Sequence, residues 1–182
     1  MNDQTLTTFF ALVALLCMAA TVLIAAGAVV MATGRAPGWL VGMRNDLGRA
    51  ALRIAPLVAG GATLGSLYYS EVVGYQPCVL CWAQRIFMYS LALVLTVGAI
   101  RNDFGVRAYG LVLAIPGWGF AAFHQLLVAG VIPESIKPCT RGVPCSQTVI
   151  EWFGFLTIPL LSLAAFSTII ALLLAAHLRS RK

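Results

Sequence analysis

Two cysteines three positions apart, Cys78 and Cys81, are the residues of this sequence best suited to chemistry. This spacing can close a disulfide across one tight turn and can also open it, so the pair is a candidate redox centre. Trp82 starts a long apolar run, and a helix beginning there would place Cys81 at its N-terminus. Unpaired backbone N–H groups and the helix dipole at that end favour a thiolate, the reactive form of cysteine. We therefore expect Cys81 to be activated.

Arg85 follows Cys81 by four residues, which puts both side chains on one face of a helix, with Arg85 one turn deeper. An arginine inside an apolar segment is costly unless it finds a partner, so it is a candidate functional residue. Two interpretations remain open. The guanidinium can snorkel to the headgroups or pair with Glu71, or it can stabilise a thiolate or an electron-rich ligand beside the cysteines. The neighbouring cysteine pair favours the second.

A second pair, Cys139 and Cys145, lies in the longest polar loop, at about residues 132–153. Gly142 and Pro144 lie between the two cysteines and allow a turn that brings the sulfurs together. Alone, this pair is either a structural disulfide or a redox pair. With the first pair it indicates a relay, because two such pairs on one side of a helical bundle can pass a disulfide between them through mixed disulfides.

The composition determines where this chemistry takes place. The chain has 182 residues, of which 60% are hydrophobic and 10% charged, and its mean hydropathy is +0.92. Apolar runs of about twenty residues match the thickness of a bilayer, so we predict an all-α integral membrane protein. The net charge of +6 is spread over short loops rather than gathered on one face, which argues against nucleic-acid binding.

Five spans are predicted, at about residues 6–32, 54–73, 82–100, 108–131 and 154–176. Cys17 lies within the first and has no partner cysteine there, so we interpret it as a small buried apolar residue. Residues 33–53 form a basic linker in which apolar residues at helical spacing predict a short helix lying in the membrane interface. We also expect Pro56 in the first turn of the second span, and Gly61 and Gly65 at a helix contact.

The basic residues predict the orientation. Nine of the twelve Lys and Arg residues fall on one side of the five spans, only Lys137 and Arg141 fall on the other, and Arg85 lies within a helix. By the positive-inside rule the nine lie in the cytoplasm. Both cysteine pairs and the N-terminus then face outward, where disulfides persist, and the C-terminus is cytoplasmic.

Electrons taken from a thiol partner must leave the first pair, and the sequence shows no evident pair of haem ligands. A lipid-soluble quinone that reaches Cys81 and Arg85 within the bilayer fits best. His124 supports this interpretation, because it lies about seven residues before the outer end of its span, at a depth of roughly 10 Å, near that expected for Arg85. A core histidine that is hydrogen-bonded within the bundle is the alternative.

Two runs of residues resemble a known family. The run from Gln76 to Tyr89, which reads QPCVLCWAQRIFMY, resembles the DsbB family of disulfide-forming membrane oxidoreductases. The later run PCTRGVPC, from Pro138 to Cys145, followed by Trp152-Phe153-Gly154-Phe155 and Ile158-Pro159, is similar to the compact BdbC-type branch of that family. The resemblance covers about residues 54–177. Residues 1–53, an additional helix and basic linker, therefore lie outside a core of four helices at residues 54–182.

The resemblance implies a four-helix bundle that oxidises a DsbA-like thioredoxin-fold thiol oxidase and reduces ubiquinone or menaquinone. It implies that Cys78 and Cys81 are the quinone-coupled pair, that Cys81 is the thiolate beside the quinone, and that Arg85 stabilises both. Cys139 and Cys145 match the pair that faces the partner, with Cys139 the expected site of the mixed disulfide. His124 aligns loosely with a quinone-site histidine, and Gln84 replaces a glutamate of some members.

Two other functions remain as alternatives. A membrane reductase could export electrons outward, but this function needs a thiol pair on the cytoplasmic side, where the sequence offers none. Vitamin K epoxide reductases share the quinone chemistry, but their motif order fits less well. The second alternative is a non-catalytic protein whose four outward cysteines bind zinc.

Overall fold

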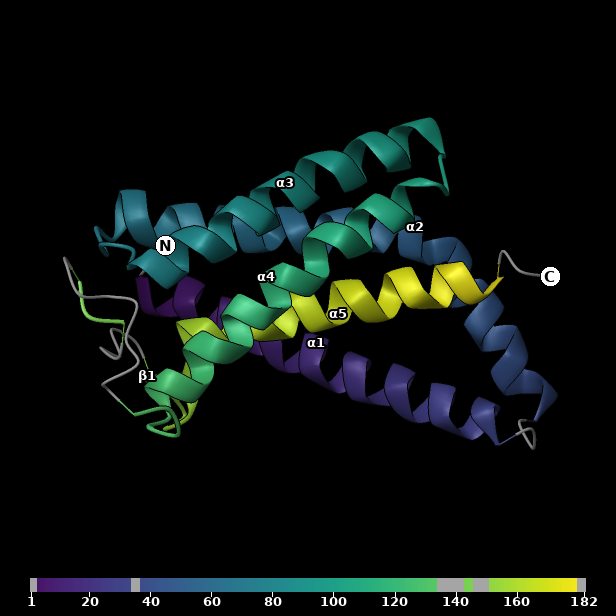
Figure 1. The fold of residues 1–182 in the computed structure, drawn as a ribbon, viewed down its shortest axis with the longest axis horizontal. Coiled ribbons are helices and arrows are strands. Elements are labelled where there is room, and N and C mark those ends of the chain that lie inside the picture. Colours follow the sequence, from purple (N-terminus) through teal and green to yellow (C-terminus); the bar gives the residue numbers. More distant parts are fainter. Residues whose placement is uncertain (1–2, 34–36, 134–142, 146–150, 180–182) are drawn as a thin grey trace.

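Five long helices and one short hairpin make up the described part of the computed structural model (Figure 1), which covers residues 3–33, 37–133, 143–145 and 151–179. The helices are α1 (Asp3–Ala32), α2 (Gly38–Leu67), α3 (Val79–Arg101), α4 (Val106–Val128) and α5 (Ile158–Arg179). A π-helical turn at Tyr68–Val72 extends α2, and strands β1 (Glu151–Trp152) and β2 (Leu156–Thr157) pair antiparallel before α5.

All five helices are long and apolar enough to cross a membrane. The prediction of an all-α chain with five spans is therefore confirmed. Two differences from the predicted bounds bear on the site, since the third helix begins three residues before Trp82 and the second begins at Gly38. These two differences have separate causes.

Helix α2 contradicts the prediction of a linker that is separate from the second span. It begins at Gly38 and runs without a break through residue 53 to Leu67, because the helical apolar pattern of the linker continues directly into the span. Pro56 consequently lies inside the helix and not in its first turn. Figure 1 shows α2 sharply bent, with its first part steeply inclined to the remainder. Proline is a common cause of such bends.

The core lies between α2, α3, α4 and α5. Its fully buried side chains include Leu91 and Leu95 of α3 and Phe166, Ile169 and Leu173 of α5. Helices α4 and α5 approach closely at Gly117, where a Cβ atom would lie 2.4 Å from the Phe166 ring. The small residue is therefore required by the packing.

Helix α1 lies beside α5 (Figure 1). The hydroxyl of Thr168 on α5 lies 2.9 Å from that of Thr21 and donates to the carbonyl oxygen of Cys17 at 3.1 Å. In apolar surroundings such hydrogen bonds between helices fix their relative position. Gly65 contacts α1 as predicted, since its Cβ position lies 3.1 Å from the Phe10 ring, whereas Gly61 faces open space.

The two termini lie at opposite ends of the bundle, as an odd number of spans requires. In Figure 1 the N-terminus lies at the left, at the end that also carries β1, and the C-terminus lies at the right, as does the turn between α3 and α4. The start of α3, with Cys78, belongs to the left end. The hairpin reverses there through Phe153 and Gly154, which both have positive φ angles (54° and 75°). The first cysteine pair is thus positioned at the end with few basic residues.

Candidate functional site

Cys78 occupies the N-terminus of α3. Its backbone is extended (φ −72°, ψ 172°), and its Sγ accepts a hydrogen bond from the backbone N–H of Cys81 at 3.3 Å. A thiol here takes the capping role that Ser, Thr, Asp or Asn usually fills, satisfying one free N–H of the first turn. The prediction that the helix starts at Trp82 with Cys81 at its N-terminus is therefore wrong, because the helix starts one turn earlier.

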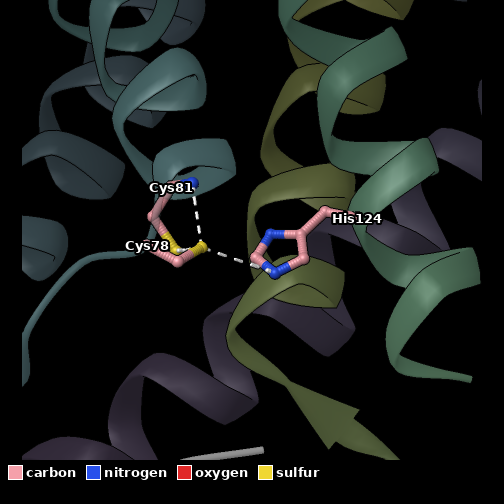
Figure 2. A group of neighbouring side chains, drawn as sticks. All are labelled: Cys78, Cys81 and His124. Carbon is pink, nitrogen blue, oxygen red and sulfur yellow. Dashed lines mark hydrogen bonds between the residues drawn. The ribbon is translucent and has the colours of Figure 1, made fainter. Parts of the chain in front are cut away.

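The two thiols of the first pair form a unit (Figure 2). Both are free, and their Sγ atoms lie 2.9 Å apart. The Cys81 thiol donates a hydrogen bond that lowers the pKa of Cys78, and His124 and the Cys81 backbone N–H lower it further, against the opposing effect of burial. These contacts favour the thiolate form of Cys78 in the reduced pair.

His124 reaches the same point from α4 and is almost fully buried, with 4% of its surface exposed. Its Nε2 lies 3.8 Å from the Cys78 Sγ (Figure 2). The same Nε2 lies 3.1 Å from the carbonyl oxygen of Cys145, while Nδ1 lies 3.0 Å from the amide nitrogen of Gln84. Since Gln84 donates to Nδ1 and a carbonyl oxygen can only accept, the hydrogen is on Nε2. His124 thus presents one N–H to both cysteine pairs.

Of the second cysteine pair, Cys145 is among the residues that the structure describes. Cys145 is disulfide-bonded and 1% exposed, and it belongs to one buried cluster with Cys78, Leu80 and Leu127. Cys139 lies outside the described residues. The structure therefore brings three of the four predicted redox and partner-facing residues to one location.

Arg85 lies one turn beyond Cys81, as predicted, and meets α2. Its Nε donates to the Ser66 hydroxyl at 2.9 Å and its Nη2 to the Ser66 carbonyl oxygen at 3.0 Å, and its guanidinium carbon lies 5.4 Å from the centre of the Trp82 ring. Glu71 accepts instead from Ser70, so the interpretation of an Arg85–Glu71 pair is not supported. The positive charge is held by neutral groups and faces a cavity.

That cavity has a volume of about 460 Å³, within the range of about 300–1,000 Å³ typical of small-molecule sites. Its lining includes Cys78, Cys81, Arg85 and His124 and is otherwise mostly apolar, with a few further polar side chains such as Ser66, Gln84 and Ser162. Ser66 is a site residue that the sequence analysis did not single out, and Gln84 is one to which it assigned no role. The available signal was a serine within the apolar run of α2, and a glutamine between Cys81 and Arg85.

Cys78, Cys81 and His124 also form the one group of candidate metal ligands found among the described residues, with ligand atoms within 4.8 Å of one another. Two thiolates and an imidazole suit zinc. The alternative with four cysteine ligands is not supported, because the disulfide-bonded Cys145 offers no thiolate. The same three residues are equally suited to thiol–disulfide exchange.

Comparison with known proteins supplies independent evidence on the family of this chain. The family model described as disulfide bond formation protein DsbB matches residues 48–176. The chain is 48% identical over 114 residues to disulfide bond formation protein C of Bacillus subtilis, covering 63% of this chain and 83% of that protein. It is 49% identical over 131 residues to a probable disulfide formation protein of Deinococcus radiodurans, covering 67% and 85%. No solved structure matches the chain significantly.

Proposed function

Since this chain belongs to the DsbB family, as its cysteine motifs predicted, we propose that it is a membrane thiol:quinone oxidoreductase. It reoxidises an extracytoplasmic, DsbA-like thioredoxin-fold thiol oxidase and passes the electrons to a membrane quinone. The observation that carries the proposal is that Cys78 and Cys81 line one cavity together with Cys145 of the second pair and with Arg85.

The first exchange takes place at the second pair. A thiolate of the reduced partner attacks Cys139 of the Cys139–Cys145 disulfide, which forms a mixed disulfide and releases the Cys145 thiolate. The second partner thiol then attacks the mixed disulfide. The partner leaves as a disulfide, and Cys139 and Cys145 together hold the two electrons.

The second exchange joins the two pairs. The Cys145 thiolate attacks Cys78 of the Cys78–Cys81 disulfide, since these two residues share a buried cluster, and Cys81 leaves as a thiolate. Cys139 then attacks Cys145, restores the second disulfide and leaves Cys78 and Cys81 reduced. The Nε2–H of His124 stabilises negative charge on Cys78 during this step. The state with Cys145 oxidised and Cys78 and Cys81 as thiols fits the end of this exchange.

The residues around the cavity fit a quinone. A quinone combines a flat ring that carries two carbonyl acceptors with an apolar tail, and this cavity offers the donors Arg85 and His124 within a mostly apolar lining. Bound there, it would accept two electrons and two protons. Arg85 supports this occupant because, among the described residues, neutral groups of Ser66 and not a carboxylate accept its hydrogen bonds, and because it lines the cavity with Cys81. Arg85 would bind a carbonyl oxygen and would stabilise the thiolate that forms on Cys81 when Cys145 attacks Cys78.

The proposed orientation follows from charge. The cysteine end faces outward and the basic loops face the cytoplasm, in accordance with the positive-inside rule. An oxidising compartment then surrounds the second pair, where a soluble thioredoxin-fold partner meets it. Residues 54–182 would form the disulfide-forming core, to which the first helix and the start of α2 are added.

Reconstitution tests the proposal directly. The purified chain in liposomes that contain ubiquinone or menaquinone should oxidise a reduced DsbA-like protein catalytically, and liposomes without quinone should allow only stoichiometric oxidation. Replacing Cys81 or Cys139 by Ala should abolish turnover. Undiminished turnover in both variants would reject the mechanism. Net reduction of an oxidised partner by the wild-type chain would favour the outward reductase instead.

A further inference from the structure

Helix α1 lies outside the region matched by the DsbB family model, yet it forms one wall of the cavity. Its lining residues are Phe9, Phe10, Val13, Ala14 and Cys17. Their spacing of three and four places them on one face of the helix, so the contact is a property of the whole helix face. Helix α1 therefore lines the same cavity as the thiols of Cys78 and Cys81.

The cavity is long and changes in character along its length. On α2 it is lined from Ser66, which holds Arg85, back to Leu57. The nine residue steps between Leu57 and Ser66 correspond to about 13.5 Å of helix at 1.5 Å per residue. The end near Arg85 carries hydrogen-bond donors, whereas the distant end is lined by Leu57, Val58 and Gly61 from α2 and by Val13 from α1. A ligand that fills it must have one polar end and an apolar extension.

The distant end is space between α1 and α2 that neither helix fills. The two helices touch where the Phe10 ring packs against Gly65 and lies 6.0 Å, between ring centres, from Tyr69. One turn further along α2, a Cβ atom at Gly61 would meet nothing within 4 Å. The hydrogen bonds of Thr21 and Thr168 described above fix α1 against α5. The gap is thus part of the packed structure.

We propose that α1 completes the acceptor site, and that the gap between α1 and α2 holds the polyprenyl tail of the quinone while its ring lies at Cys81 and Arg85. This inference rests on the function proposed above and assigns a role to the first helix. The tail is favoured over a lipid acyl chain because the gap is continuous with the polar end that binds the ring. Ala14 lines the cavity with a small side chain, which restricts the space for the tail little.

The test introduces a larger side chain into the gap from each of the two helices. Ala14→Leu enters it from α1 and Gly61→Leu from α2, and Ala19→Leu, on the exposed face of α1, is the matched control. Two acceptors are compared, a polyprenyl quinone and a quinone of the same ring without a tail. The measurements are the KM for each acceptor and the rise in Tm that each produces with the reduced protein in detergent.

Both filling variants should raise the KM for the tailed quinone about tenfold, which corresponds to about 1.4 kcal/mol. In both variants the tailed quinone should also lose most of the rise in Tm that it produces in the wild type. Their values for the tailless quinone should change less than about twofold, and Ala19→Leu should match the wild type for both acceptors. If one filling variant does not fold, the other gives the same comparison. Wild-type behaviour in a folded filling variant, or equal losses for both quinones, would overturn the inference.

The proposed function fails in a different way. If the wild-type chain neither reduces nor is stabilised by either quinone, the quinone site itself is refuted. If the wild type reduces both quinones with equal KM and the filling variants do not change this, the redox function stands and the gap holds a lipid acyl chain. The two failures are thus distinguished by the wild type alone.

Discussion

The imidazole Nε2 of His124 lies 3.1 Å from the carbonyl oxygen of Cys145. This contact joins the middle of the bundle to the loop of the second cysteine pair, and the same nitrogen lies 3.8 Å from the Sγ of Cys78. A single N–H is therefore placed between the two pairs that must exchange electrons. Gln84 fixes its tautomer through Nδ1, so the orientation of the ring does not depend on the second pair alone.

Replacing His124 by Ala should slow exchange between the two pairs by about a hundredfold, a typical effect of removing a positioned proton donor. The cause is the loss of the N–H that stabilises negative charge on Cys78. The measurement is rapid acid quenching and thiol trapping after mixing with reduced partner, which resolves the redox state of each pair.

The other histidine provides the control, since His177 lies near the far end of α5, and His177→Ala should exchange at the wild-type rate. His124→Asn, which retains a donor of similar reach, should recover part of the rate. An unchanged exchange rate in His124→Ala would show that the histidine only fills space in the core.

The lowered pKa of Cys78 predicts how its reactivity depends on pH. A thiol is alkylated as the thiolate, so its rate falls about tenfold per pH unit below its pKa, which is about 8.5 for an ordinary cysteine. Because the folded protein lowers the pKa of Cys78, its rate should remain on the plateau at neutral pH and fall only in acid. Mass spectrometry of the Cys78 peptide after iodoacetamide treatment of the reduced protein measures this.

Cys81→Ala removes the largest cause of that shift, the hydrogen bond from the Cys81 thiol, and should move the alkylation curve of Cys78 towards higher pH. Denatured protein, in which both thiols are ordinary, supplies the reference curve. A folded wild type that follows the reference curve would refute the capping role of the Cys78 thiolate.

Arg85→Lys should raise the KM for quinone about tenfold while leaving the first, stoichiometric oxidation of the partner unchanged. Lysine keeps the charge but cannot donate to both Ser66 oxygens in the arrangement of a guanidinium. Arg107→Lys is the matched control, because Arg107 bonds the Ala176 carbonyl oxygen at the opposite end of the bundle. Equal quinone kinetics in the two variants would exclude Arg85 from the acceptor site.

The number of spans was predictable from the sequence because a bilayer requires runs of about twenty apolar residues, and such runs appear in composition alone. The start of α3 was not predictable in this way. Apolar residues begin at Val79 as well as at Trp82, and only the three-dimensional structure shows that the Cys78 sulfur caps the helix. The thiol nearest the helix N-terminus was therefore assigned incorrectly.

Contacts between residues that are far apart in the sequence were the other feature that could not be predicted. The distance from Cys81 to Arg85 follows from helical spacing, so their common face was correctly predicted. The contact of Arg85 with Ser66 and that of His124 with Cys145 join separate elements, and nothing in local periodicity specifies them. The contribution of α1 to the cavity escaped prediction for the same reason, since the DsbB motifs begin after it.

The close approach of α4 and α5 gives a last prediction, on stability. A Cβ atom at Gly117 would lie 2.4 Å from the ring of Phe166, which is fully buried and cannot move towards solvent. Gly117→Ala should therefore destabilise the protein by about 1–3 kcal/mol, which lowers Tm by several degrees at about 2–4 °C per kcal/mol for a chain of this size. Gly119→Ala, two residues away on α4, meets nothing within 4 Å and should leave Tm unchanged or slightly raised.

Adding Phe166→Leu to Gly117→Ala should destabilise the protein by less than the sum of the two single changes, because the smaller side chain makes room for the methyl group. Additive losses, or equal Tm values for Gly117→Ala and Gly119→Ala, would contradict close packing at this point.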